Sequence, residues 1–272
     1  LIETLLRKYP GRDEIQLLAT DFFINSRDYK EALLTIKPLL KGRETKYELW
    51  RQGVLLANVT GNNTDMQVIS SRAIEIFPDS IELFYFKGIA EWELQEYESL
   101  IKTYSNERIS NMKDQEMLSQ MRMMVAESYH QLEMYDISDR IFRKMIKDEP
   151  DNYLIMNNFS YYLSIRGEFL NEAKKYSRIA IENNPENGTF LDTYAWILYK
   201  SGEYEEAAKF IQKALQFGGN DSPVINEHAG DIHSQTGNIA LARTFYQKAI
   251  ILGGDRDNLI EKLKKLSIKY VE

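Results

Sequence analysis

The 272-residue chain has no cysteine, which excludes disulfides, thiolate metal sites and cysteine nucleophiles. Proline and glycine are scarce as well, with six and fourteen residues. Together with many Leu, Ala, Glu and Lys residues, this scarcity favours an all-helical protein over a β-rich one. The formal net charge of −7 disfavours a nucleic-acid binder or an anionic-membrane binder, because such proteins need clustered Lys and Arg.

Long apolar runs are also missing. The longest uncharged run, residues 152–165, has 14 residues with several Asn and Ser, which is too short and too polar to span a membrane. No signal peptide is visible, so the sequence predicts no direct membrane insertion. Because the chain begins at Leu1 without a Met, we expect it to be a trimmed or processed part of a larger parent protein.

What the sequence does contain is best seen in residues 188–222, which the spacing of apolar residues predicts to be two amphipathic helices and a tight turn. The first apolar face carries Leu191, Tyr194, Ala195 and Leu198. The second carries Ala207, Ile211, Ala214 and Leu215. Gly202 ends the first helix, and Gly218 with Gly219 ends the second, because glycine accepts left-handed backbone angles.

These residues resemble the tetratricopeptide repeat, a pattern of large apolar, Leu-Gly, Tyr, Ala, Phe, Ala and Pro positions over 34 residues. The same pattern recurs in phase along the chain. The resemblance implies an all-α fold, a right-handed superhelix (solenoid) of about seven helix pairs. The predicted repeats are residues 13–46, 47–80, 81–118, 119–152, 153–187, 188–222 and 223–256, after the second helix of a truncated repeat at 1–12 and before a capping helix at 257–272, all within one domain, 1–272.

Individual positions of the pattern carry further predictions. Trp50, Gly88, Ala207 and Ala242 occupy signature positions and should be buried between helices. Arg27 replaces the turn glycine of the first repeat. The third repeat is longer than the others, because the fourth starts 38 residues after it, and this predicts a longer helix or a loop near residues 110–115.

Stacking of the repeats uses the signature positions, so recognition is left to a second stripe of each first helix, which faces the inner curve of a superhelix. The candidate peptide-binding residues on this stripe are Arg51, Tyr85, Trp92, Glu127, His130, Asn157, Asn158, Tyr161, Asp192, Trp196 and Tyr199. Aromatic side chains here would pack on a bound segment at low entropy cost. Acidic residues along the stripe favour a neutral or basic peptide segment or helix as the partner.

Several of these residues have a second interpretation. Trp92 and Trp196 fit packing between repeats as well as groove contact. Asn157 and Asn158 would hydrogen-bond an extended backbone, as single Asn residues do in some members of the family, although no Asn ladder recurs. One variety of the family clamps a terminal carboxylate with Lys, Asn and Arg, and of these the comparable positions offer Arg51, so the clamp is absent.

Catalytic and metal signals are weak. Glu227, His228 and Asp231 are close in sequence, but without a second histidine a hydrogen-bonded or solvent-facing His228 is favoured over a metal ligand. Nucleotide-binding, hydrolase and metalloprotease motifs do not occur, so we expect no cofactor and no enzyme activity.

The sequence therefore predicts a non-catalytic scaffold that binds another protein in a concave groove. The alternative is a recognition domain of a larger cell-envelope enzyme or assembly machine whose active part lies outside this chain. The repeat idiom is similar to that of bacterial tetratricopeptide proteins, many of them in the cell envelope. A periplasmic or outer-membrane-associated lipoprotein is thus the favoured location, with the cytoplasm as the alternative. Self-association through apolar surface at residues 1–12 stays open.

Overall fold

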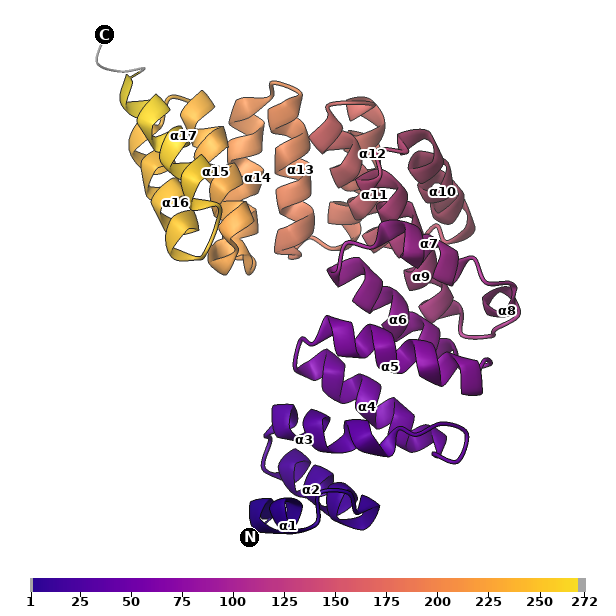
Figure 1. Ribbon diagram of the computed structural model, residues 1–272. Helices are drawn as coiled ribbons and strands as arrows, with labels where there is room; N and C mark the ends of the chain where they lie inside the picture. Colours follow the sequence, from indigo (N-terminus) through magenta and orange to yellow (C-terminus); the bar gives the residue numbers. More distant parts are fainter. Residues whose placement is uncertain (1, 269–272) are drawn as a thin grey trace. The chain divides into compact units, whose positions relative to one another are not determined.

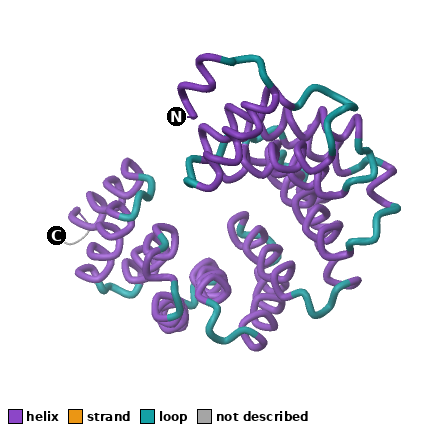
Figure 2. Tube along the Cα trace, turned by 90° about the horizontal axis from the view of Figure 1, so that it is seen from below, coloured by secondary structure: helices purple, strands orange, loops and turns teal. Residues whose placement is uncertain are grey.

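The computed structural model describes residues 2–268. These residues form 17 α-helices and two short 3-10 helices, which are joined by turns and loops (Figure 1). No strand occurs among these residues (Figure 2). The helices pack in consecutive pairs joined by short turns, which confirms the predicted all-α helical repeat. Residue 1 of the predicted first helix and residues 269–272 of the predicted capping helix lie outside the described residues.

The chain divides into two compact units, described separately below. Unit 1 comprises residues 1–141. Its helices are α1 (Ile2–Lys8), α2 (Asp13–Asn25), α3 (Tyr29–Ile36), η1 (Lys37–Leu39), α4 (Tyr47–Val59), α5 (Asn63–Ile76), α6 (Ile81–Glu93), α7 (Tyr97–Tyr104), α8 (Glu107–Ser110), α9 (Gln115–Gln131) and the first half of α10 (Tyr135–Asp148), in which the division falls.

Unit 2 comprises residues 142–272. After the second half of α10, its helices are α11 (Tyr153–Arg166), α12 (Leu170–Asn183), α13 (Gly188–Lys200), α14 (Tyr204–Gln216), η2 (Gly219–Asp221), α15 (Pro223–Gln235), α16 (Ile239–Ile251) and α17 (Arg256–Ile268). The first helices α11, α13 and α15 contact one another in this order, and each also packs on its own second helix.

The turns within the helix pairs need one residue in the left-handed backbone conformation, with a positive φ, whether or not that residue is glycine. Arg27 takes a φ of 61°, close to the 65° of Gly61 at the corresponding turn of the next pair. Gln95 and Glu133 adopt the same conformation at their turns. For side chains larger than glycine this backbone costs free energy, so packing of the two helices must hold it in place.

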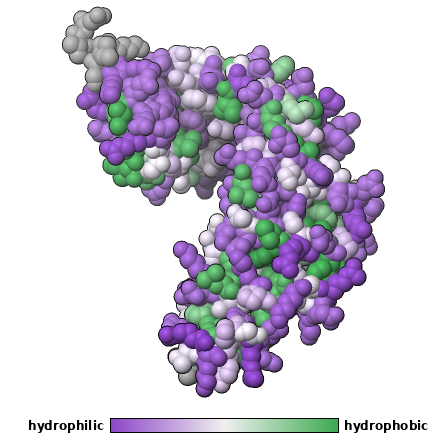
Figure 3. Space-filling view, in the orientation of Figure 1, coloured by the Kyte–Doolittle hydropathy of each residue, from purple (hydrophilic) through white to green (hydrophobic). Residues whose placement is uncertain are grey.

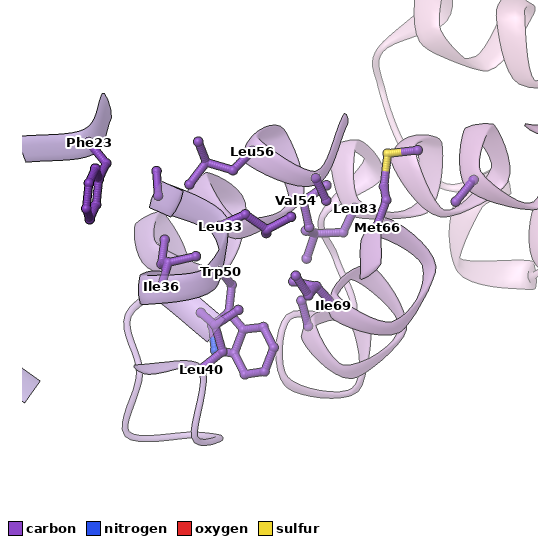
Figure 4. Close-up of a cluster of buried hydrophobic side chains, with 14 of the residues drawn as sticks. Phe23, Leu33, Ile36, Leu40, Trp50, Val54, Leu56, Met66, Ile69 and Leu83 are labelled. Atoms are coloured by element: carbon purple, nitrogen blue, oxygen red, sulfur yellow. The ribbon is translucent and has the colours of Figure 1, made fainter. Parts of the chain in front are cut away.

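Packing in unit 1 centres on residues that the repeat pattern predicted to be buried. Trp50 has an exposed fraction of 0% and lies among Ile36, Leu40 and Ile69 (Figure 4). Such a large side chain contributes several kilocalories per mole to the core, by the measured cost of its removal. Its burial confirms the prediction for this position.

Two buried glycines allow a tyrosine to cross the first helix of its own pair. A Cβ added to Gly88 would lie 2.0 Å from Cζ and Oη of Tyr104. In unit 2 a Cβ on Gly230 would lie 2.3 Å from Cε1 of Tyr246. Helix pairs α6–α7 and α15–α16 therefore approach this closely only because these positions lack a side chain.

The four extra residues of the third repeat lie where the sequence predicted an irregularity. The second helix α7 ends early at Tyr104, and α8 and a loop over residues 111–114 lead into α9. Ile109 and Met121 close a small apolar cluster beneath this segment. On the face that Figure 3 displays, apolar residues form small patches between polar ones in each unit.

Candidate functional site

The clearest surface depression built from candidate residues lies in unit 2, over the first helices α11, α13 and α15. Its volume is about 220 Å³. The residues that line it are Asn157, Asn158, Tyr161, Thr189, Asp192, Thr193, Ser222, Val224 and Ile225. Four of these are predicted site residues, and the surface that they form with Trp196 and Tyr199 is called the α11–α15 face below.

Helix capping sets the register of this face. Asn187 Oδ1 accepts hydrogen bonds from the backbone N–H of Thr189 and Phe190, each at 3.1 Å, and so starts α13. Ser222 Oγ accepts from the N–H of Ile225 at 3.3 Å, with Pro223 as the first residue of α15. Because the first helices start at matching points, their fifth residues fall at equivalent positions on the face.

A buried acid–histidine pair joins α13 to α15. His228 Nδ1 lies 2.9 Å from Asp192 Oδ1 and 3.1 Å from Oδ2. Both residues are buried, and Asp192 has an exposed fraction of 6%. His228 is therefore a hydrogen-bonded histidine, the interpretation favoured over a metal ligand. Among the residues that the structure describes, no group of three or more His, Cys, Asp or Glu is placed to hold a metal ion.

Trp196 is part of an aromatic stack on the same face. Its ring lies 4.0 Å from that of His228 and 4.8 Å from that of Tyr199, with interplanar angles of 15° and 16°. Its Nε1 is buried without a hydrogen-bond partner in the described part of the chain. Trp196 is half-buried, so it packs between repeats and also keeps surface at the face.

The opposite side of the depression is formed by α11. Asn157 has an exposed fraction of 3% and donates from Nδ2 to Asn158 Oδ1 at 3.2 Å. Tyr161 is half-buried beside them. Burial raises the pKa of the Tyr161 phenol, and the negative charges of Asp192 and Glu227 raise it further. This phenol therefore stays protonated and is available as a hydrogen-bond donor.

Next to this face, a polar network holds α17 against α15. Lys262 Nζ lies 2.7 Å from Glu227 Oε1 and 2.7 Å from Asp231 Oδ2. Tyr246 donates to Asp231 Oδ1 at 2.7 Å. Burial lowers the pKa of Lys262, but its hydrogen bonds to Asp231 and Glu227 outweigh burial and raise it. Two of the acids on this side are thus neutralised in part by one lysine.

In unit 1, two of the predicted residues are already engaged or partly covered. Arg51 on α4 is exposed but pairs with Glu82 on α6, with Nε 2.8 Å from Oε2. Tyr85 is half-buried, and burial raises the pKa of its phenol. Its backbone carbonyl accepts a hydrogen bond from Tyr104 at 2.9 Å.

The remaining three predicted residues of unit 1 lie on α6 and α9. Trp92 is half-buried and packs edge-to-face on Tyr97, at 5.3 Å between ring centroids. His130 is buried, with its ring 5.1 Å from that of Tyr135, whereas Glu127 is half-buried. The structure thus spreads the five residues of unit 1 over three helices, while it gathers the six of unit 2 on one face.

Sequence reasoning did not find several residues of the site. Thr189, Thr193 and Ser222 line the depression with hydroxyl groups, and Val224 and Ile225 give it an apolar side. All five lie off the stripe of each first helix that was used for the prediction. The spacing of 36 residues between Asp192 and His228, about one repeat, was the signal that could have found their pair.

Comparison with known proteins agrees with this architecture. Residues 190–217 and 225–250 match the family model of the tetratricopeptide repeat. A tetratricopeptide repeat protein from Parabacteroides merdae ATCC 43184 superposes with a TM-score of 0.75 at 17% identity, over 94% of this chain and 98% of that one. A thermophilic repeat protein from Thermus thermophilus superposes at 0.57 and 15%, over 70% of this chain and 100% of that one. No curated protein matches the sequence.

Residues 190–217 and 225–250 are therefore tetratricopeptide repeats, and the chain has the fold of a tetratricopeptide-repeat protein, as its sequence predicted. A chain from the APC/C hetero-tetramer Cut9–Hcn1 shares the fold as well, with a TM-score of 0.66 at 11% identity over 96% of this chain and 50% of that one. Repeats of this kind generally serve as protein–protein interaction modules and are usually non-catalytic. Within the described residues, no helix combines the length and apolarity needed to cross a membrane.

Proposed function

We propose that this chain is a non-catalytic interaction module that binds an extended, neutral or basic segment of a partner protein on the α11–α15 face. The observation that supports this most is the face itself, because residues of three adjacent helices line its depression with buried hydrogen-bonding groups, and half-buried aromatic rings of α11 and α13 belong to the same face. Such a mixture of polar anchors and rigid rings is typical of surfaces that bind peptides.

The polar residues of the face would recognise the backbone of the segment. Asn158 and Tyr161 lie at the open side of the depression, where their side chains are partly exposed. An amide group both donates and accepts, so Asn158 would pair with a peptide group of an extended chain. Trp196 and Tyr199 would pack on the side chains of the segment beside it.

Charge supports a partner that is not acidic. Glu227 and Asp231 are neutralised in part by Lys262, and Asp192 adds a further negative charge beside the depression. An acidic segment would meet only like charge on its way into the depression. A neutral or basic segment would not be repelled.

The test begins with a photo-crosslinking amino acid at Val224, which lines the depression and has an exposed fraction of 50%. The full-length protein would be crosslinked in its native cells, and the captured partner would then be purified. Its affinity should fall by about 5- to 30-fold in Asn158→Ala and in Tyr161→Ala, because each removes a contact worth about 1–2 kcal/mol.

A matched control is Leu241→Ala on α16, since Leu241 is similarly exposed at 47% but lies on a second helix. This variant should bind the partner as the wild type does. Unchanged affinity in both face variants, with circular dichroism showing intact helices, would rule out the proposal.

A further inference from the structure

We infer that the depression on the α11–α15 face is a pocket for a cationic side chain, a lysine or arginine of the bound segment. This inference rests on the proposed function and extends it by naming what the segment must carry. Four observations lead to it: the charge of the pocket, an acceptor without a donor, the size of the pocket, and the way that one repeat differs from the next.

The pocket is negatively charged. Of the nine residues that line it, Asp192 alone carries a formal charge, and none is basic. Its carboxylate is buried, where an uncompensated charge is costly. His228 Nδ1 lies on one side of this carboxylate, 2.9 Å from Oδ1 and 3.1 Å from Oδ2. A cationic group in the pocket would approach the carboxylate from the side that faces the depression.

The pocket also holds an acceptor that lacks a donor. Asn157 Oδ1 is buried and has no hydrogen-bond partner among the described residues, although its Nδ2 is used. Rotation about the final side-chain torsion of Asn is soft, so a small turn would bring this oxygen toward a ligand. Lysine and arginine end in three and five N–H donors and no acceptor, which suits the acceptor oxygens of Asp192 and Asn157.

The difference between successive repeats explains why the pocket exists. The sixth residue of α15 is His228, which reaches the fifth residue of α13, Asp192. The sixth residue of α13 is the much shorter Thr193, whose hydroxyl donates a hydrogen bond to the backbone carbonyl of Thr189 at 3.2 Å. Nothing comparable to the imidazole therefore reaches Asn157, the fifth residue of α11, and a space is left beside it.

The size and walls of this space suit such a side chain. At about 30 Å³ for each water-sized group, 220 Å³ holds about seven, the size of an arginine side chain. Val224 and Ile225 offer an apolar wall for the methylene groups, while the charged end meets the polar one. Burial is the main reason that the pKa of Tyr161 is raised, and the smaller rise from Asp192 and Glu227 agrees with a negative field inside the pocket.

The probe for the test is a short capped alanine peptide with one central arginine, compared with the same peptide carrying citrulline, the uncharged isostere. Binding to the full chain is measured by titration calorimetry or by NMR shifts of α11, α13 and α15. We expect the arginine peptide to bind at least about tenfold more tightly, with an advantage that shrinks as salt is added. A lysine peptide, compared with norleucine, distinguishes ammonium from guanidinium.

Variants of the chain test whether the preference for the arginine peptide over the citrulline peptide comes from the pocket. Asp192→Asn should remove it, whereas Glu205→Gln, which deletes one exposed carboxylate from α14, should retain it. Because Asp192→Asn also disturbs a buried pair, Val224→Lys serves as a second variant. It supplies a competing ammonium from a half-exposed position on the rim without touching the core.

The outcomes separate this inference from the proposed function. Equal binding of the arginine and citrulline peptides would overturn the cationic pocket and leave a face that still binds extended chains. A preference that survives both Asp192→Asn and Val224→Lys would overturn it too. Binding of neither peptide to the folded protein would also overturn it, and the proposed function would then be decided by the crosslinked partner alone.

Discussion

Replacing Lys262 by methionine should loosen α17 from α15 while the rest of unit 2 stays folded. The lysine makes two charge-assisted hydrogen bonds of 2.7 Å, to Glu227 and Asp231. Its side chain has an exposed fraction of 24%, and the two carboxylates have 23% and 13%. Methionine keeps most of the apolar stem, so the change isolates the charge.

The expected cost follows from these contacts. Hydrogen bonds to charged groups contribute about 1.5–3 kcal/mol each, and removing one partner of a buried ion pair costs about 3–5 kcal/mol. The residual exposure of all three side chains lowers both figures, because water screens the pair and solvates the carboxylates that are left. We therefore expect a loss of about 2–4 kcal/mol in the free energy that opens α17.

Amide hydrogen exchange measures this quantity for each helix. A loss of 2–4 kcal/mol corresponds to about 30- to 1000-fold faster exchange at buried α17 positions such as Leu259. The matched control is Lys265→Met, which breaks the exposed pair with Glu261 on the same helix and should hardly change exchange. Equal effects of the two variants would refute the reasoning, because burial would then not be what makes the Lys262 network strong.

Two further predictions concern stability. Burial lowers the pKa of His233 below its ordinary 6.5, so the unfolded chain binds a proton that the folded chain does not, and the melting temperature should fall as the pH drops below 6.5. The variant His233→Phe should flatten this dependence. Gly88→Ala should cost about 1–3 kcal/mol in urea unfolding, since its Cβ would lie 2.0 Å from the buried Tyr104 ring. Gly53→Ala should cost less, because only the flexible Leu40 tip lies close, at 2.9 Å, and an equal cost would contradict this explanation.

Repeat periodicity made the fold predictable, because a position that packs inside one helix pair packs inside every pair. Trp50, Ala207 and Ala242 are fully buried as this rule requires. The left-handed turn at Arg27 was also predictable, since the geometry of the pair demands it even where the residue is unfavourable. The repeat boundaries and the groove residues of both units stay predictions.

Departures from the repeat could not be predicted in the same way. Glu91 is fully buried on α6, where it accepts hydrogen bonds from Lys87 and Ser99, both at 2.6 Å. In the sequence it is one acid among many on a helix surface, and only the packing of α7 shows that it lies inside. The sequence gives the net charge, but it does not show which acidic side chains are paired with a basic one in the folded chain. Glu227 and Asp231, which both pair with Lys262, are a second example.

Two successive contacts between first helices of unit 2 differ. The fifth residue of α13, Asp192, meets the sixth residue of α15, and the fifth residue of α11, Asn157, lines the depression together with the sixth residue of α13. Where that sixth residue is His228, the contact is filled; where it is Thr193, it is left open beside Asn157. In the proposed cationic pocket, the short side chain of Thr193 would thus set where on the α11–α15 face a partner's side chain is received.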